Sequence, residues 1–235
     1  MKKENTEKKT IETAGKRKKP EKKGEKKAEL NDRVETILEA LDRHYGKEAA
    51  CGLQHETDWQ LLFATMLSAQ CTDKRVNLVT KDLFRKYPTL QSFADADLSE
   101  LEEDIRSTGF YHHKAQNIKA AAGKLLEQYG GKMPQTIEEL TGLPGVGRKT
   151  ANIIRGLVFH EPSIVVDTHV KRISHLLGLT DTLDPVKAEF ELMEILPEDH
   201  WILWNADLID LGRKTCIANR PKCESCILKD FCPAS

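Results

Sequence analysis

Two glycines in the run LPGVGRKTAN, residues 143–152, carry the first chemical hint in this sequence. Gly145 and Gly147 flank the apolar Val146, so Val146 can be buried while the glycines adopt backbone angles that other residues avoid. Residues 148–158 continue with an apolar stripe at helical spacing, which places the glycines at a helix N-terminus, where free N–H groups and the helix dipole attract phosphate. The pattern predicts a phosphate-binding hairpin. A GxG alone would favour an ordinary turn between helices.

Lys149 follows Gly147 by two positions, and Asp167 follows Lys149 by eighteen. A neutral lysine amine can attack a sugar carbon and form a Schiff base, and a carboxylate can assist. Asp167 directly precedes THVKR and is predicted to be a helix N-cap. We interpret the pair as a nucleophile and its partner, although Lys149 taken alone would be a phosphate-binding or solvated lysine. His169 is predicted to be structural.

Four of the six cysteines stand in the last twenty residues with the spacing C-x6-C-x2-C-x5-C: Cys216, Cys223, Cys226 and Cys232. Four thiolates at this spacing can hold a tetrahedral zinc ion or a [4Fe–4S] cluster, and the spacing does not decide between them. Cys51 and Cys71 stand apart, so the pattern favours a metal site in a reducing compartment over a disulfide framework.

Helices must position these residues, because apolar side chains recur at helical spacing from Leu30 onward. The only β-like run, residues 164–166, is too short to found a sheet. The sequence also predicts helix ends: an N-cap at Asp58, capping boxes at Ser99 with Glu102 and at Thr136 with Glu139, a stop at Gly130–Gly131, and a first helical turn at Pro185. The predicted fold class is all-α.

Charge is distributed unevenly along the chain. Residues 1–29 hold twelve Lys or Arg against six Glu, a net of +6, and the remainder holds 24 basic against 31 acidic residues. We expect residues 1–29 to be a disordered basic tail, either a DNA-binding arm or a functionally quiet extension. In the acidic body, contact with DNA must come from local basic patches: Arg148, Lys149, Lys171, Arg172, Arg213, Lys214, Arg220 and Lys222.

No apolar run approaches the ~20 residues of a membrane helix, and the N-terminus lacks the apolar stretch of a secretory signal. The composition therefore excludes a membrane protein and predicts an enzyme-sized globular chain in the cytoplasm.

Taken together, these motifs closely resemble those of the endonuclease III family of DNA glycosylases and AP lyases, in the helix-hairpin-helix superfamily. The resemblance covers roughly residues 30–235 and rests on LSAQCTD at 67–73, GFYHHKAQNI at 109–118, LPGVGRKTAN, VDTH at 166–169 and the cysteine spacing. It implies that Lys149 is the nucleophile, that Asp167 stabilises the positively charged sugar, and that the four cysteines bind a [4Fe–4S] cluster. It also implies phosphate contacts at Gly145, Gly147 and Arg148.

The resemblance implies a two-lobed layout. A six-helix barrel is expected at residues 51–160, and a second helical lobe from residues 30–50 and 161–235, ending in the cluster loop. The implied activity is removal of oxidised pyrimidines from double-stranded DNA, followed by cleavage 3′ to the abasic site. We expect a monomer in the cytoplasm, associated with the nucleoid.

A damaged nucleotide must leave the duplex before a lysine can reach its sugar. The resemblance implies that Gln70 and Phe110 fill the gap, although the family commonly has leucine at the second position. The structural alternatives are a polar residue at a helix end for Gln70 and a core aromatic for Phe110.

Three other functions compete with this interpretation. An adenine-specific mismatch glycosylase would lack the lysine and carry a glutamate in the helix that ends at LSAQ, and residues 61–70 contain none. A non-enzymatic DNA-binding module would need neither Lys149 nor Asp167. An iron–sulfur electron carrier would need no hairpin.

Overall fold

The computed structural model describes residues 27–47 and 51–235, and within these ranges the chain is helical and contains no strand. The predicted all-α class is confirmed, and the buried residues 164–166 belong to neither a helix nor a strand in the described structure. The α-helices are α1 (Lys27–Tyr45), α2 (Asp58–Leu67), α3 (Asp73–Lys86), α4 (Leu90–Asp95), α5 (Leu98–Ile105), α6 (Tyr111–Tyr129), α7 (Ile137–Thr141), α8 (Arg148–Val158), α9 (Thr168–Leu176), α10 (Pro185–Met193) and α11 (Trp201–Lys214). Four short 3₁₀ helices are η1 (Arg106–Thr108), η2 (Glu198–His200), η3 (Cys223–Ser225) and η4 (Lys229–Phe231).

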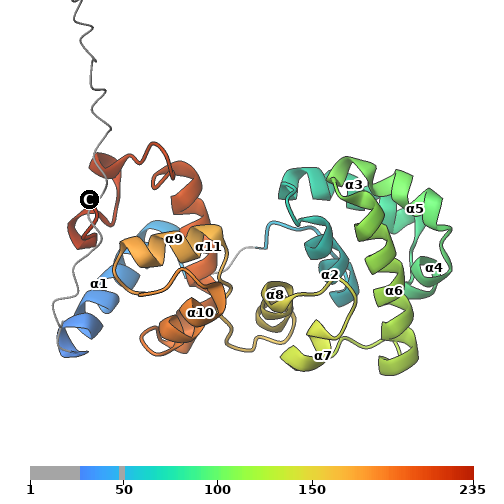
Figure 1. The fold of residues 1–235 in the computed structure, drawn as a ribbon, viewed down its shortest axis with the longest axis horizontal. Coiled ribbons are helices and arrows are strands. Elements are labelled where there is room, and N and C mark those ends of the chain that lie inside the picture. The colour runs from blue at the N-terminus through green and yellow to red at the C-terminus, as the bar shows by residue number, and fades with distance from the viewer. Residues whose placement is uncertain (1–26, 48–50) are drawn as a thin grey trace, which may run out of the picture.

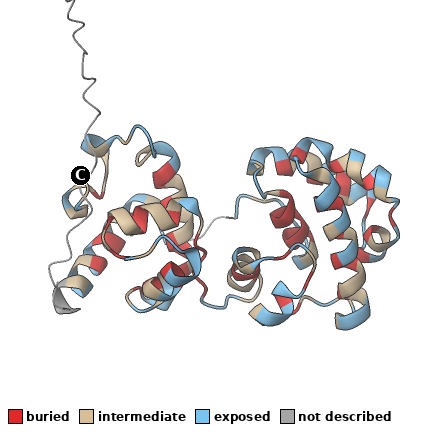
Figure 2. Cartoon of the chain, in the orientation of Figure 1, coloured by how far each residue is buried: buried red, intermediate tan, exposed pale blue. Residues whose placement is uncertain are grey.

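The helices form two lobes, each around its own apolar core (Figure 1). The first lobe consists of α2 to α8 and is organised around α2, whose residues from Gln60 to Leu67 are all buried (Figure 2). A helix that is apolar all round is stable only when other helices surround it. Aromatic side chains of α2, α3 and α4 pack edge to face within this core, for example Phe63 against Phe93 with ring centroids 5.0 Å apart.

The second lobe joins α1, from the beginning of the described chain, to α9, α10 and α11 from its C-terminal part (Figure 1). Trp204 of α11 is buried at its centre and donates its indole N–H to Ser174 Oγ of α9 at 3.1 Å. The predicted boundaries at residues 29/30, 50/51 and 160/161 stay predictions. Most of the predicted tail lies outside the described residues, and α1 begins at Lys27, before the expected end of the tail.

The predicted helix ends are partly confirmed. Thr136 and Glu139 form a capping box, Gly130 ends α6 in the left-handed region, and Pro185 is the first residue of α10. The prediction for α5 was wrong, because the carboxylate of Asp97 caps it in place of Ser99 and the helix starts two residues earlier than expected.

The N-cap predicted at Asp58 was also wrong. Thr57 and Gln60 form a reciprocal capping box that satisfies two backbone N–H groups, whereas Asp58 is the first residue inside the helix.

Among the described helices, none is both long and apolar enough to cross a membrane.

Candidate functional site

The glycine hairpin lies between α7 and α8 as predicted, but its two glycines differ. Gly145 has φ +74°, the left-handed region, and a Cβ there would stand 2.7 Å from Cβ of Asn117 on α6. Gly147 has φ −93°, which any residue adopts, and a Cβ there would meet nothing within 4 Å. The expectation of special backbone angles is therefore correct for Gly145 and wrong for Gly147. Val146 between them is buried, as expected.

Gly147 occupies the N-cap position of α8, and no side chain caps this helix. The first turn of α8 thus presents N–H groups, with the positive end of the helix dipole, next to the hairpin. Lys149 is the second residue of α8 and is exposed. Within the described part of the chain no hydrogen bond or ion pair engages its ammonium group.

Asp167 is the N-cap of α9, as predicted. Its Oδ1 accepts hydrogen bonds from the backbone N–H groups of His169 at 2.8 Å and Val170 at 2.9 Å. Oδ2 takes part in neither bond. The cap therefore fixes the half-buried carboxylate while leaving one oxygen for another partner.

A polar network ties the start of α8 to the second lobe. Arg148 donates from Nε and Nη2 to the two carboxylate oxygens of Glu189 on α10, at 2.8 and 2.7 Å. Asn152, one turn further along α8, donates from Nδ2 to Glu189 Oε1 at 3.0 Å and to the carbonyl of Ile164 at 2.9 Å. The helix that carries Lys149 is thus bonded to the segment that leads to Asp167.

Neither Glu189 nor Asn152 was among the predicted site residues. Glu189 is only 5% exposed, and it lies on the face of α10 that also buries Ala188 and Leu192. An acidic residue on the apolar face of a helix is the signal that could have identified it.

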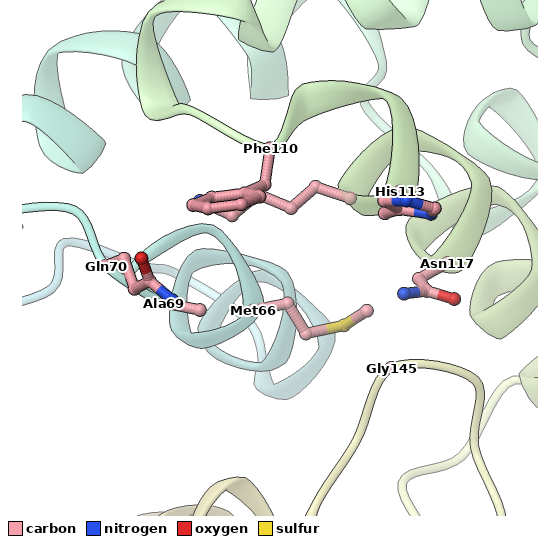
Figure 3. Close-up of a pocket in the computed structure, with 8 residues that line it drawn as sticks. Met66, Ala69, Gln70, Phe110, His113, Asn117 and Gly145 are labelled. Atoms are coloured by element: carbon pink, nitrogen blue, oxygen red, sulfur yellow. The ribbon is translucent and has the colours of Figure 1, made fainter.

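Two further motifs meet the hairpin at a cavity of about 170 Å³ (Figure 3). Its lining comes from the end of α2, the start of α6 and the hairpin: Met66, Ala69, Gln70, Phe110, His113, Lys114, Asn117 and Gly145. Lys149 and Asp167 do not line it.

Gln70 and Phe110 share an uncommon backbone conformation at this cavity. Both are non-glycine residues in the left-handed region, with φ of 55° and 50°. Gln70 is exposed and lies beyond the end of α2, and Phe110 is 63% exposed immediately before α6. The alternative interpretation of Phe110 as a core aromatic is therefore wrong.

The four cysteines of the C-terminal loop are half-buried free thiols. Burial raises the pKa of the Cys226 and Cys232 thiols, and the other cysteines of the set contribute to the rise, which places the four close together. Arg172 of α9 holds the start of the loop by donating to the carbonyl of Cys216 at 2.6 Å and to its Sγ at 3.4 Å.

A site made of four clustered, half-buried thiols fits a metal group that thiolates bind. Over residues 27–47 and 51–235, however, no three His, Cys, Asp or Glu side chains converge to hold a single metal ion.

The predicted basic patches are partly engaged within the protein. Arg148 pairs with Glu189, Arg172 bonds Cys216, and Lys214 lies 2.7 Å from Asp210. Arg213, Arg220 and Lys222 are exposed, as is Lys149.

Residues 63–198 match the family model of the HhH-GPD superfamily base excision DNA repair protein. The chain is 45% identical over 211 residues to endonuclease III of Synechocystis sp., covering 89% of this chain and 96% of that protein. It is 44% identical over 185 residues to endonuclease III of Bacillus subtilis, covering 78% and 84%.

Among solved structures, a trapped endonuclease III–DNA covalent intermediate superposes with a TM-score of 0.80 at 41% identity, covering 87% of this chain and 96% of that chain. A thermostable thymine-DNA glycosylase, at 20% identity and a TM-score of 0.75, shares the fold. The chain therefore belongs to the endonuclease III family, within the HhH-GPD superfamily of base excision DNA repair proteins.

Proposed function

We propose that this protein is a bifunctional DNA glycosylase and AP lyase of base excision repair, with Lys149 as its nucleophile. The observation that carries the proposal is the exposed Lys149 at the uncapped N-terminus of α8, directly after the left-handed turn at Gly145. The free N–H groups there bind a DNA phosphate, and this contact places a deoxyribose next to the amine. Support also comes from the relative whose covalent intermediate with DNA was trapped.

The reaction proceeds in two stages on one amine. Neutral Nζ of Lys149 attacks C1′ of the damaged nucleotide, the C1′–N bond to the base breaks, and the base leaves with that electron pair and takes up a proton. The amine then loses a proton and the C1′–O4′ bond breaks, with O4′ taking up a proton, which opens the sugar ring and leaves a protonated Schiff base between Nζ and C1′. Loss of a C2′ proton then drives β-elimination, in which the C3′–O bond breaks and the 3′ phosphate departs. Water finally hydrolyses the Schiff base and restores the lysine.

Asp167 stabilises the positive charge that builds on the sugar as the base leaves. Its Oδ1 is held by two backbone N–H groups, so the free Oδ2 is presented in a fixed orientation. A charge held in place before the reaction loses little energy to reorganisation.

The substrate is double-stranded DNA that contains an oxidised pyrimidine or an abasic site. Gln70 and Phe110 enter the gap that the extruded nucleotide leaves, since both are exposed at one cavity beside the hairpin. We further propose that the protein works in the cytoplasm, associated with the nucleoid, as a monomer.

We also propose that Cys216, Cys223, Cys226 and Cys232 hold a [4Fe–4S] cluster. When bound, this group cross-links the C-terminal loop and orders the exposed basic segment 220–222 for contact with DNA, with no part in the bond-breaking step. Anaerobically purified protein is expected to be brown, to absorb near ~400 nm and to contain about four irons. Stoichiometric zinc without a visible band would contradict the assignment.

Borohydride trapping on abasic duplex DNA tests the central proposal. Wild-type protein should form a covalent complex with the DNA. The Lys149→Gln variant should form no complex, release no base and cleave no strand, but it should still bind the DNA. Lys187→Gln is the matched control, because Lys187 is an exposed lysine in the first turn of α10. Strong trapping by Lys149→Gln would mean that another amine reacts. No trapping by the wild type would favour a mismatch glycosylase or a binding module.

A further inference from the structure

Lys114 on α6 is a buried lysine with two specific acceptors. The residue is only 7% exposed, and its Nζ donates to the carbonyls of Leu67 and Thr108, each at 2.8 Å. Leu67 is the last residue of α2, and Thr108 is the last residue of η1. Carbonyls at helix ends lack intrahelical partners and carry partial negative charge, so they suit an ammonium donor.

The two carbonyls belong to the segments that carry Gln70 and Phe110. Gln70 follows Leu67 by three residues, and Phe110 follows Thr108 by two. Because both carbonyl oxygens lie 2.8 Å from one nitrogen, they can be no more than 5.6 Å apart. Lys114 thereby holds the end of α2 close to the end of η1, two residues before Phe110.

The same lysine lines the cavity at which Gln70 and Phe110 are exposed. In Figure 3 these two residues lie on one side of the cavity, and His113, Asn117 and Gly145 on the other. Both Gln70 and Phe110 are in the left-handed region, which costs roughly 1–2 kcal/mol for a residue with a Cβ. Such a conformation persists only where the surrounding structure enforces it.

Stability alone is a poor reason to bury an ammonium group here. Burial lowers the pKa of Lys114, opposed by a smaller effect of Cys71, because the charged form loses its hydration. The two hydrogen bonds offset this cost but leave no net gain over an apolar core. An apolar side chain, however, could not join the two helix-end carbonyls of Leu67 and Thr108 at one point.

We propose that Lys114 is a positioning residue that sets the spacing and orientation of Gln70 and Phe110 for entry into the DNA gap. This inference rests on the proposed function. Lys114 does not touch the reacting atoms, and its effect is confined to substrates in which a nucleotide must be extruded from a duplex.

Lys114→Met tests the inference, since methionine keeps an unbranched chain and removes both hydrogen bonds. Single-turnover release of an oxidised pyrimidine from duplex DNA should fall about tenfold or more. Cleavage of an abasic site in single-stranded DNA, where there is no duplex gap to fill, should change less than about twofold. Lys119→Met is the matched control, because Lys119 lies on the same helix and donates to a backbone carbonyl, Ala96 O at 2.5 Å, outside the cavity.

A second comparison separates positioning from general destabilisation. In a Gln70→Ala/Phe110→Ala background, Lys114→Met should add little further loss on the duplex, because the residues it positions are already gone. If Lys114→Met does not fold, Lys114→Arg replaces it in the comparison of the two substrates. Because arginine keeps donors within reach of the carbonyls, its loss of base release from duplex DNA should be smaller.

Unchanged release from the duplex, or equal losses on both substrates, would overturn the inference. A wild-type protein inactive on both substrates would instead contradict the proposed function.

Discussion

At the scale of single residues, Asp167 combines a structural task with the proposed catalytic one. One carboxylate oxygen caps α9 through two backbone hydrogen bonds, and the other takes no part in the cap. Substitution can therefore separate the two tasks, because an amide oxygen can still cap a helix but carries no charge.

For Asp167→Asn we expect single-turnover base release to fall by about 10²-fold or more, because the charge that stabilises the sugar cation is lost. The melting temperature should change little. Asp184→Asn is the matched control, since Asp184 caps α10 by accepting from Lys187 N at 2.9 Å. An Asp167→Asn protein that melts earlier than wild type yet turns over normally would leave only the capping role.

Arg148 shows how a residue's neighbours alter its expected role. Its position beside Gly147 predicts a phosphate contact, yet Nε and Nη2 of its guanidinium donate to Glu189, and the ring centroid of Phe190 lies 5.2 Å from the guanidinium carbon. The hydrogen bonds to Glu189 raise the pKa of Arg148, and burial opposes this rise. Its charge is largely balanced within the protein, so we expect phosphate binding to depend more on the backbone N–H groups of α8.

At the scale of elements, the hairpin depends on one of its glycines for conformation. Gly145→Ala should destabilise the protein by roughly 1–3 kcal/mol, because φ of +74° is strained for alanine and the new methyl would overlap Asn117. Gly147→Ala is the matched control for stability, since its φ of −93° is ordinary and its Cβ meets nothing. Urea denaturation measures both variants, and equal stabilities would contradict the assigned difference between the glycines.

The interface between α1 and α11 contains a buried acid, Asp207, which is 7% exposed. Burial and the negative charge of Asp42 raise the pKa of Asp207 to about 7, with smaller effects of His200, which opposes the rise, and Asp210. The native state thus keeps a proton that the unfolded chain releases near pH 4. The contribution of Asp207 to stability is therefore complete below that pH and is lost as pH rises through about 7.

Asp207→Asn should remove this pH dependence, since asparagine does not ionise. Between pH 5 and pH 8 the free energy of unfolding of the wild type should fall relative to the variant by roughly 2–3 kcal/mol. Denaturation in urea at the two pH values measures the difference. Asp82→Asn is the control, because the side chain of Asp82 is 76% exposed, and its free energy of unfolding should change with pH as that of the wild type does. The same pH dependence in Asp207→Asn would contradict the prediction.

At the scale of the whole molecule, the network around Glu189 joins the two lobes next to the proposed catalytic residues. In Glu189→Gln an NH₂ group replaces one carboxylate oxygen and faces the donors of Arg148 or Asn152. The variant should therefore lose roughly 1–3 kcal/mol of stability. Base release should also slow, because Glu189 holds Arg148 and Asn152 on α8, and Asn152 in turn bonds the segment that leads to Asp167.

Glu103→Gln is the control for this variant, because Glu103 pairs with Arg106 on the surface at 3.2 Å with side chains 71% and 63% exposed. An exposed pair contributes between about 0 and 1 kcal/mol. Denaturation and single-turnover kinetics distinguish the two variants. A Glu189→Gln protein as stable and as fast as Glu103→Gln would show that the network does not align the lobes.

Local sequence patterns determined much of the secondary structure of this protein. Apolar residues at helical spacing predicted an all-α chain, Thr136 with Glu139 and Pro185 marked helix starts, and the Gly145 turn followed from its neighbours. These features depend on residues within one or two helical turns, so the sequence contains the whole of their physical cause. The sequence motifs also predicted the endonuclease III family.

Tertiary structure decided how distant residues meet. Glu189 lies 41 positions from Arg148, and Leu67 lies 47 positions from Lys114, so no local pattern could pair them. The two failed helix starts have a local cause: Thr57 and Asp97 stand one and two residues before the expected caps, Asp58 and Ser99, and their side chains bond the free N–H groups. The pairs Glu189–Arg148 and Leu67–Lys114 are contacts of another kind. Such contacts arise only when packing has fixed the geometry of both partners, because hydrogen bonds depend on distances and angles that sequence spacing does not specify.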